Sequence, residues 1–99
     1  MKVKIEEKIL GVDGKTPLMN PESQSDLTLR DVCINSLLSP MEGDTEVTKY
    51  EKYELFKRIR TAKLEVEFKV EETAIIKKCI GKFQPPLILG QAFDLIEGK

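Results

Sequence analysis

The first nineteen residues carry the pattern of a β-hairpin. Residues 2–10 alternate between apolar side chains and lysines or glutamates, which is the period of a strand with one buried face. The pair Asp13-Gly14 favours a tight turn because both residue types tolerate a positive φ. Residues 15–19 are therefore the predicted returning arm. Pro17 removes a backbone donor from this arm, so we expect it to be short or to lie at a sheet edge.

Two segments then repeat apolar residues at helical spacing. In the first, Thr28 can cap a helix together with Asp31, and Pro40 ends it because the residue before a proline avoids the helical region. Its apolar stripe consists of Leu29, Val32, Cys33, Ser36 and Leu37. The second helix is predicted to start within residues 44–48 and to run to about Ala62. Its broader apolar stripe consists of Val47, Tyr50, Tyr53, Leu55, Phe56, Ile59 and Ala62.

The last third of the chain predicts a strand and two more helices. Residues 64–69 alternate again and are the predicted third strand, pairing with the N-terminal hairpin; the alternative is a turn leading straight into the next helix. That helix covers about residues 71–80, with Gly81 placed to end it. Pro86 suits the first position of a fourth helix. Because this helix is apolar nearly all round, we expect it to be largely buried, with part of it at an interface.

These elements predict an α+β fold. It consists of an N-terminal β-hairpin, or of a three-stranded antiparallel sheet if residues 64–69 join it, packed on three to four α-helices. A chain of 99 residues is expected to form a single small domain, residues 1–99, because smaller pieces would not bury a core.

Composition excludes several classes of function. The net charge is −1, from 16 basic and 17 acidic residues, so the basic excess that is typical of nucleic-acid binders is missing. The sequence has no histidine, which removes histidine-based catalytic triads and most zinc sites. It also has no glycine-rich phosphate loop. We therefore predict no catalytic residue, no cofactor and no metal, and expect that the protein is not an enzyme.

The cysteines and the N-terminal segment indicate a cytoplasmic protein. Cys33 and Cys79 are the only cysteines, and both fall on apolar helix positions, where a reduced thiol acts as a small hydrophobe. The first residues form no uninterrupted apolar stretch, so no signal peptide is predicted. Every apolar run is shorter than the roughly 20 residues that span a bilayer, and no membrane partner is expected.

Residues 49–63 hold the candidate binding residues. They form a basic group with aromatic neighbours: Tyr53, Phe56, Lys57, Arg58, Arg60 and Lys63. One interpretation is contact with a phosphate, a nucleotide or RNA, with bases stacking on the rings. The other is a solvated helix face whose cations pair with Glu46, Glu51 and Glu54 at intervals of three and four residues. The regular spacing of the acidic residues favours the second interpretation.

Three stretches carry a family resemblance. They are residues 12–15 (Val-Asp-Gly-Lys), 27–32 (Leu-Thr-Leu-Arg-Asp-Val) and 86–95 (Pro-Leu-Ile-Leu-Gly-Gln-Ala-Phe-Asp-Leu). In their order the chain resembles short uncharacterised proteins encoded by bacteriophages and prophages. The resemblance implies a phage origin, and it supplies no active residues to carry over.

Three functional hypotheses follow. The first is a non-enzymatic phage accessory protein that binds a host or phage protein in the host cytoplasm, through the hairpin edge or the C-terminal helix. The second is a small-ligand or nucleic-acid binder using the basic face of residues 49–63; nucleic acid is less favoured as a partner, because the net charge is close to zero. The third is a structural or assembly component that self-associates as a homo-oligomer.

Overall fold

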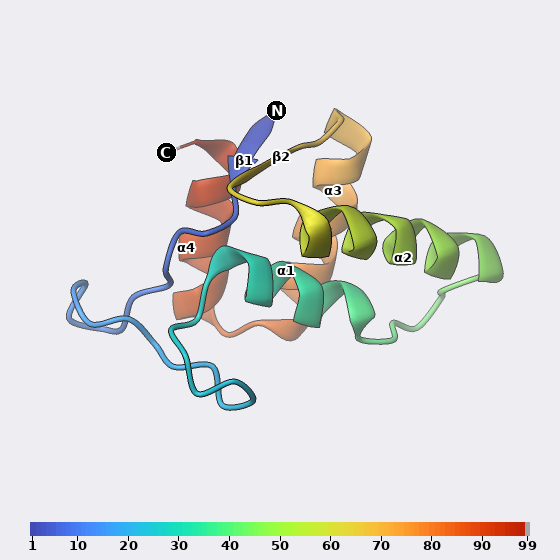
Figure 1. Cartoon of the computed structure of the whole chain (residues 1–99). Helices are drawn as coiled ribbons and strands as arrows, with labels where there is room; N and C mark the ends of the chain where they lie inside the picture. The colour runs from blue at the N-terminus through green and yellow to red at the C-terminus, as the bar shows by residue number, and fades with distance from the viewer. Residues whose placement is uncertain (99) are drawn as a thin grey trace.

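The computed structural model describes residues 1–98, in which four helices pack together with one two-stranded antiparallel sheet at one end of the molecule (Figure 1). The predicted α+β class is confirmed. In chain order the elements are β1 (Lys2–Lys4), α1 (Leu29–Leu38), α2 (Glu46–Thr61), β2 (Glu65–Glu67), α3 (Val70–Phe83) and α4 (Pro86–Glu97).

The sheet pairs β1 with β2, so the strand predicted within residues 64–69 exists and joins the N-terminal strand. Val3 lies opposite Val66 in the register, and both side chains are buried in the core. The flanking positions face outward and place a lysine opposite a glutamate: Lys2 opposite Glu67 and Lys4 opposite Glu65. Opposite charges across strands stabilise a pair of this kind.

The predicted hairpin forms around Asp13-Gly14 but stays irregular. The Gly11 amide donates to the Thr16 carbonyl at 2.8 Å, and Leu10 and Pro17 make one isolated bridge. The regular strand is shorter than the predicted residues 2–10. After β1 the backbone turns to the start of α1 instead, where the Leu29 and Arg30 amides donate to the carbonyls of Glu7 and Ile5, both at 2.9 Å.

Helix α1 lies at the centre of the fold and contacts α2, α3 and α4. The predicted capping box at its start, between Thr28 and Asp31, is confirmed. All of its predicted apolar positions are buried: Leu29, Val32, Cys33, Ser36 and Leu37. All of them except Ser36 join one hydrophobic core with residues of both strands and the other three helices.

Helix α2 begins and ends where the sequence predicts, but its apolar stripe is narrower. Thr45 caps it with Thr48, and its buried residues are Lys52, Leu55 and Ile59. Val47, Tyr50 and Tyr53 are instead 68%, 61% and 46% exposed, so their placement on a core-facing stripe is wrong. The first turns of α2 project beyond the other helices (Figure 1), and its main contact is with α1.

The C-terminal helices differ from the expectation in two ways. Helix α3 continues through Gly81 to Phe83, because Gln84 precedes Pro85 and is forced out of the helical region. Helix α4 does begin with Pro86 at its first turn. Its buried residues are Ala92 and Ile96, and Ile88, Leu89, Phe93 and Leu95 are partly buried against the core, so the helix is buried less fully than the sequence predicts. No helix within residues 1–98 has the length and apolar character needed to cross a membrane.

Candidate binding surface

The side of α2 that points away from the core is the most distinctive exposed surface. We define the outward face of α2 as five residues: Glu46, Tyr50, Tyr53, Lys57 and Arg60. They follow one another at alternating intervals of four and three residues, which keeps them on one side of a helix. The buried side, with Leu55 and Ile59, lies opposite.

Aromatic rings on and beside this face lie close to cations of the following turn. The ring centroids of Tyr50 and Tyr53 lie 6.2 Å apart, and those of Tyr53 and Phe56 lie 6.1 Å apart. The Lys57 ammonium lies 5.0 Å from the centroid of Tyr53, and the Arg60 guanidinium lies 5.1 Å from that of Phe56. Each distance is within the range of a cation–π contact. Lys57 and Arg60 therefore each lie over an aromatic ring of the preceding turn.

Glu54 neutralises part of the positive charge that Lys57 brings to the outward face of α2. Its carboxylate lies 3.2 Å from the Lys57 ammonium. A hydrogen bond to the Tyr50 hydroxyl, together with one to Lys57, lowers the pKa of Glu54. The hydrogen bond to Glu54 in turn raises the pKa of Lys57 and that of Tyr50. Lys57 therefore remains charged but already has a partner.

Arg58 serves the fold rather than a ligand. Its Nη1 donates to the Glu72 carboxylate of α3 at 2.5 Å, and its Nη2 donates to the Glu67 carbonyl of β2. Its guanidinium also lies 5.6 Å from the ring centroid of Phe68. A backbone hydrogen bond from Lys69 and the ion pair with Arg58 lower the pKa of Glu72. Arg58 thus joins α2 to the two elements that follow it.

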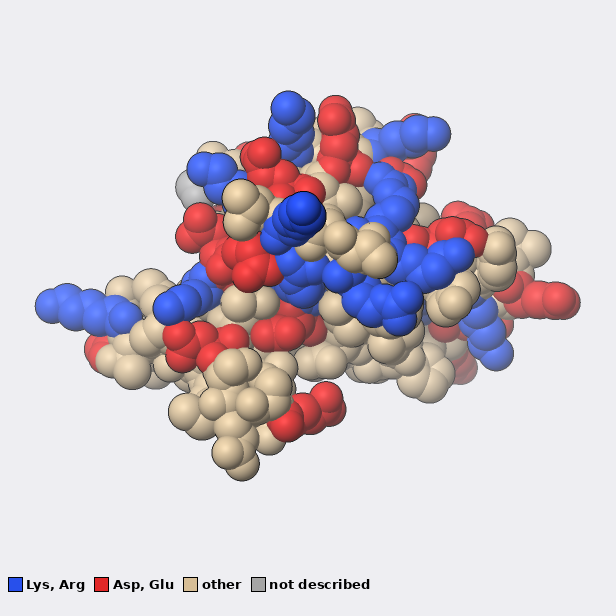
Figure 2. Space-filling view, viewed as in Figure 1, with Lys and Arg blue, Asp and Glu red and all other residues tan. Residues whose placement is uncertain are grey.

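The six predicted binding residues therefore separate into two groups. Tyr53, Phe56, Lys57 and Arg60 lie along one side of α2, whereas Arg58 faces β2 and α3. Lys63 is exposed and lies beyond the end of α2, and its carbonyl accepts a hydrogen bond from Arg30. Figure 2 shows basic and acidic side chains interspersed over the visible surface rather than gathered into one basic patch. This arrangement favours the interpretation of paired charges.

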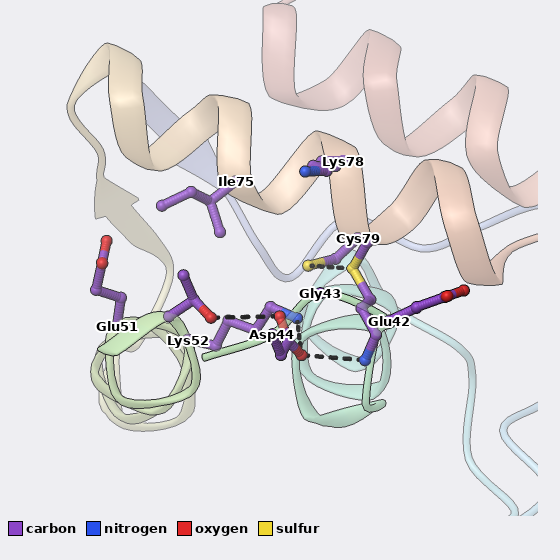
Figure 3. Close-up of a pocket in the computed structure, with 10 residues that line it drawn as sticks. Glu42, Gly43, Asp44, Glu51, Lys52, Ile75, Lys78 and Cys79 are labelled. Carbon is purple, nitrogen blue, oxygen red and sulfur yellow. Dashed lines mark hydrogen bonds and ion pairs between the residues drawn. The ribbon is translucent and has the colours of Figure 1, made fainter. Parts of the chain in front are cut away.

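A separate hollow of about 200 Å³ lies between α2, α3 and the preceding linker (Figure 3). The Lys52 ammonium and the Asp44 carboxylate meet at its wall, 2.9 Å apart, and this contact lowers the pKa of Asp44. The Cys79 Sγ lies 3.9 Å from the Met41 Sδ, and burial raises the pKa of the Cys79 thiol. A protonated thiol beside a lysine that is already paired is not an activated nucleophile.

Two features of these sites are not evident in the sequence. Lys52 falls within the basic segment of residues 49–63 but is buried. Leu38, at the end of α1, is 53% exposed and lines a shallow hollow next to Lys49 and Tyr53. A hydrophobic residue in the last turn of an amphipathic helix gives no signal of exposure. Within residues 1–98, no cluster of three acidic or thiol side chains is arranged to hold a metal ion.

The comparisons with known proteins add no name to this surface. No protein-family model matches the chain, and no match was found among curated proteins or solved structures. The resemblance to phage-encoded proteins therefore stays a prediction. Function is inferred below from the exposed residues of α2 and their geometry.

Proposed function

We propose that this chain is a non-enzymatic accessory protein that acts by binding another protein, and that the outward face of α2 is its contact surface. The observation that carries the proposal is the exposure of Tyr50 and Tyr53 on this face, with the exposed apolar side chains of Val47 and Leu38 next to it. A small monomer gains nothing from leaving such groups in water, and contiguous exposed apolar patches mark interaction sites.

The chemistry of the face suits a protein partner. Tyrosine and arginine are enriched among the residues that dominate binding energy at protein interfaces. Tyr50 and Tyr53 stand at the centre of the face, and charged residues rim it at both ends. The two other predicted contact surfaces, the hairpin edge and the C-terminal helix, are less suited to a protein partner. Each strand has three residues, which leaves little edge for strand addition, and the apolar residues of α4 are mostly packed against the core.

The absence of histidine and the paired state of Lys52 support a non-enzymatic role. Both cysteines are free and buried, which fits a reducing compartment and supports the cytoplasm as the setting. The resemblance to phage and prophage proteins makes a host or phage protein the first partner to test.

Nucleic-acid binding is the second candidate, because two cation–π contacts lie beside exposed rings. It would use Lys57 and Arg60, with bases stacking on Tyr50 and Tyr53. The reversal of Lys57 and Arg60 to glutamate together should then abolish binding of a single-stranded oligonucleotide, and binding should weaken steeply with salt. Equal retention of the oligonucleotide by the wild type and this variant would exclude the candidate.

The protein-binding proposal is tested by capture from native host lysate at moderate salt, with and without nuclease, followed by mass spectrometry. We expect one protein to be retained in near-equal amount after nuclease treatment, and to be lost when Tyr53 is replaced by glutamate. Lys15→Glu, an exposed charge reversal in the hairpin loop, is the matched control and should retain the partner. A protein retained equally by Tyr53→Glu would show that the outward face of α2 is not the contact surface.

A further inference from the structure

We propose that the partner which the outward face of α2 fits is a second copy of the same chain, with the two α2 helices packed antiparallel. This inference rests on the proposed function, because it names the occupant of the same face. It is carried by the spacing, the charge order and the accessibility of the five residues that form the face.

The spacing is that of a helix–helix seam. Glu46, Tyr50, Tyr53, Lys57 and Arg60 follow at intervals of four, three, four and three residues. Alternation of three and four places side chains along one line of contact between two paired helices, as in a two-stranded coiled coil. Residues at these positions would meet the same set of five positions on a second α2 along most of its length.

The charges along the seam are ordered. Glu46 is the acidic residue of the first turn of α2, whereas Lys57 and Arg60 lie toward its end. The two tyrosines stand between them. A helix with an acidic start, an aromatic centre and a basic end is complementary to itself when one copy is reversed.

An antiparallel pair centred on Tyr53 brings unlike groups together at every position of the seam except Tyr53 itself. Glu46 of one copy then faces Arg60 of the other, and Tyr50 faces Lys57. Tyr53 lies on the two-fold axis and meets its own counterpart. Such an isologous contact makes each heterotypic pair twice. Charge complementarity of this kind fixes the register of an interface. A parallel pair would instead place Glu46 against Glu46 and Arg60 against Arg60.

The cation–π geometry within one copy is compatible with this contact. Lys57 already lies over Tyr53, and Arg60 lies over Phe56, so both cations are directed along the helix rather than away from it. In the dimer, the Lys57 ammonium of one copy would make a further cation–π contact with Tyr50 of the other copy.

The face is accessible within residues 1–98, since four of its five residues are exposed and Lys57 is half-buried. The buried side of α2 rests on α1, and the first turns of α2 project beyond the other helices (Figure 1). A helix of 16 residues spans about 24 Å, so the interface is at the small end of specific contacts. We therefore expect a weak dimer, with a dissociation constant on the order of micromolar.

Sedimentation velocity with purified protein tests the inference, through two charge reversals that are designed as a pair. Glu46→Arg and Arg60→Glu each create two like-charge contacts in an antiparallel homodimer, and each should raise the dissociation constant at least tenfold. Circular dichroism first verifies that each variant keeps its helical content and thermal transition, since both positions are exposed. Lys15→Glu is the control and should dimerise like the wild type.

The two variants mixed in equal amounts should dimerise again, because arginine at position 46 of one chain faces glutamate at position 60 of the other at one end, and Arg60 of the first chain faces Glu46 of the second at the other end. The double variant Glu46→Arg/Arg60→Glu should likewise recover dimerisation. Weakening by each single reversal together with recovery in the double variant supports the antiparallel register, because a parallel homodimer opposes like charges at positions 46 and 60 in the wild type, in each single variant and in the double variant alike. A wild type that stays monomeric up to about 1 mM, or dimers that neither reversal weakens, would overturn the inference.

The failure of this inference is distinguishable from failure of the proposed function. A strictly monomeric wild type that still captures a lysate protein through Tyr53 would overturn the second copy as occupant and leave the proposed function intact. A monomeric wild type that captures nothing would overturn both.

Discussion

The Lys52 ammonium lies 2.9 Å from the Asp44 carboxylate, and the two side chains are only 9% and 11% exposed. Asp44 also accepts the Met41 amide at 3.0 Å. The carboxylate therefore fastens the linker between α1 and α2 to the middle of α2. A charge pair with so little solvent contact depends on both partners, because either charge alone would be poorly solvated.

Replacement of Lys52 by alanine should lower the free energy of unfolding by about 1–3 kcal/mol, because the Asp44 carboxylate loses its partner. The double variant Lys52→Met/Asp44→Asn removes both charges at similar volume and should be more stable than Lys52→Ala. Urea unfolding of the single and double variants measures the coupling. Additive effects of the two substitutions would show that the pair does not act as a unit.

Arg30 ties α1 to the end of α2 through three backbone carbonyls. Its guanidinium donates to Ile59 at 2.7 Å, to Arg60 at 3.0 Å and to Lys63 at 2.9 Å. Carbonyls at a helix C-terminus lack partners within the helix, and the planar guanidinium can reach several of them at once.

Substitution of Arg30 by lysine should therefore destabilise the fold by roughly 2 kcal/mol although the charge is kept. The compact ammonium group of lysine cannot donate to the three carbonyls at once as the planar guanidinium does. The control is Lys8→Ala, which removes an ion pair with Asp26 whose side chains are 56% and 44% exposed; it should change stability by less than about 1 kcal/mol. Thermal unfolding of the three proteins measures the difference. Equal transition temperatures for Arg30→Lys and the wild type would show that the hydrogen bonds from Arg30 to the three carbonyls do not stabilise the fold.

Local signals explain what the sequence could predict. The capping box at Thr28 and the stripe that ends at Leu37 involve neighbours within a few turns, so α1 was predicted residue by residue. The exposure of Tyr50 and Tyr53 depends on where α1 ends in space, which no local pattern records. The burial of Lys52 likewise depends on Asp44 reaching it from a linker. The candidate surface could thus be located on the second helix, but its outward residues could not be separated from core positions.

Gly81 illustrates the same limit and gives a third prediction. It lies inside α3, is exposed, and a Cβ added there would meet nothing within 4 Å. Gly81→Ala should therefore stabilise the protein by about 0.5–1 kcal/mol, because alanine restricts the unfolded chain and favours the helix.

Gly43 provides the matched comparison for this substitution. It also has open space for a Cβ, but its φ is +90°, a value that L side chains rarely adopt. Gly43→Ala should destabilise the protein by about 1 kcal/mol or more. Chemical unfolding of both variants measures the two effects. A change of the same sign for both would contradict the assignment of backbone conformations at the two glycines.

Asp13 yields a prediction on pH dependence. Its carboxylate accepts the amides of Lys15 and Thr16, both at 2.9 Å, and the Thr16 hydroxyl at 2.7 Å. These hydrogen bonds, with the Thr16 amide as the largest contributor, lower the pKa of Asp13 from 3.8 to about 2. Because the folded pKa lies below the unfolded value, the turn gains stability from the carboxylate above about pH 4 and loses it as the pH falls toward 2.

The titration of Asp13 by NMR should therefore show a midpoint of about 2, and the Lys15 and Thr16 amide resonances should shift over the same range as their acceptor is protonated. In Asp13→Asn, which cannot ionise, those two resonances should stop responding between pH 4 and pH 2. The rest of the fold should be unaffected, since the turn is exposed and lies outside the core. A midpoint near the ordinary value of 3.8 would mean that the carboxylate does not hold the turn in solution.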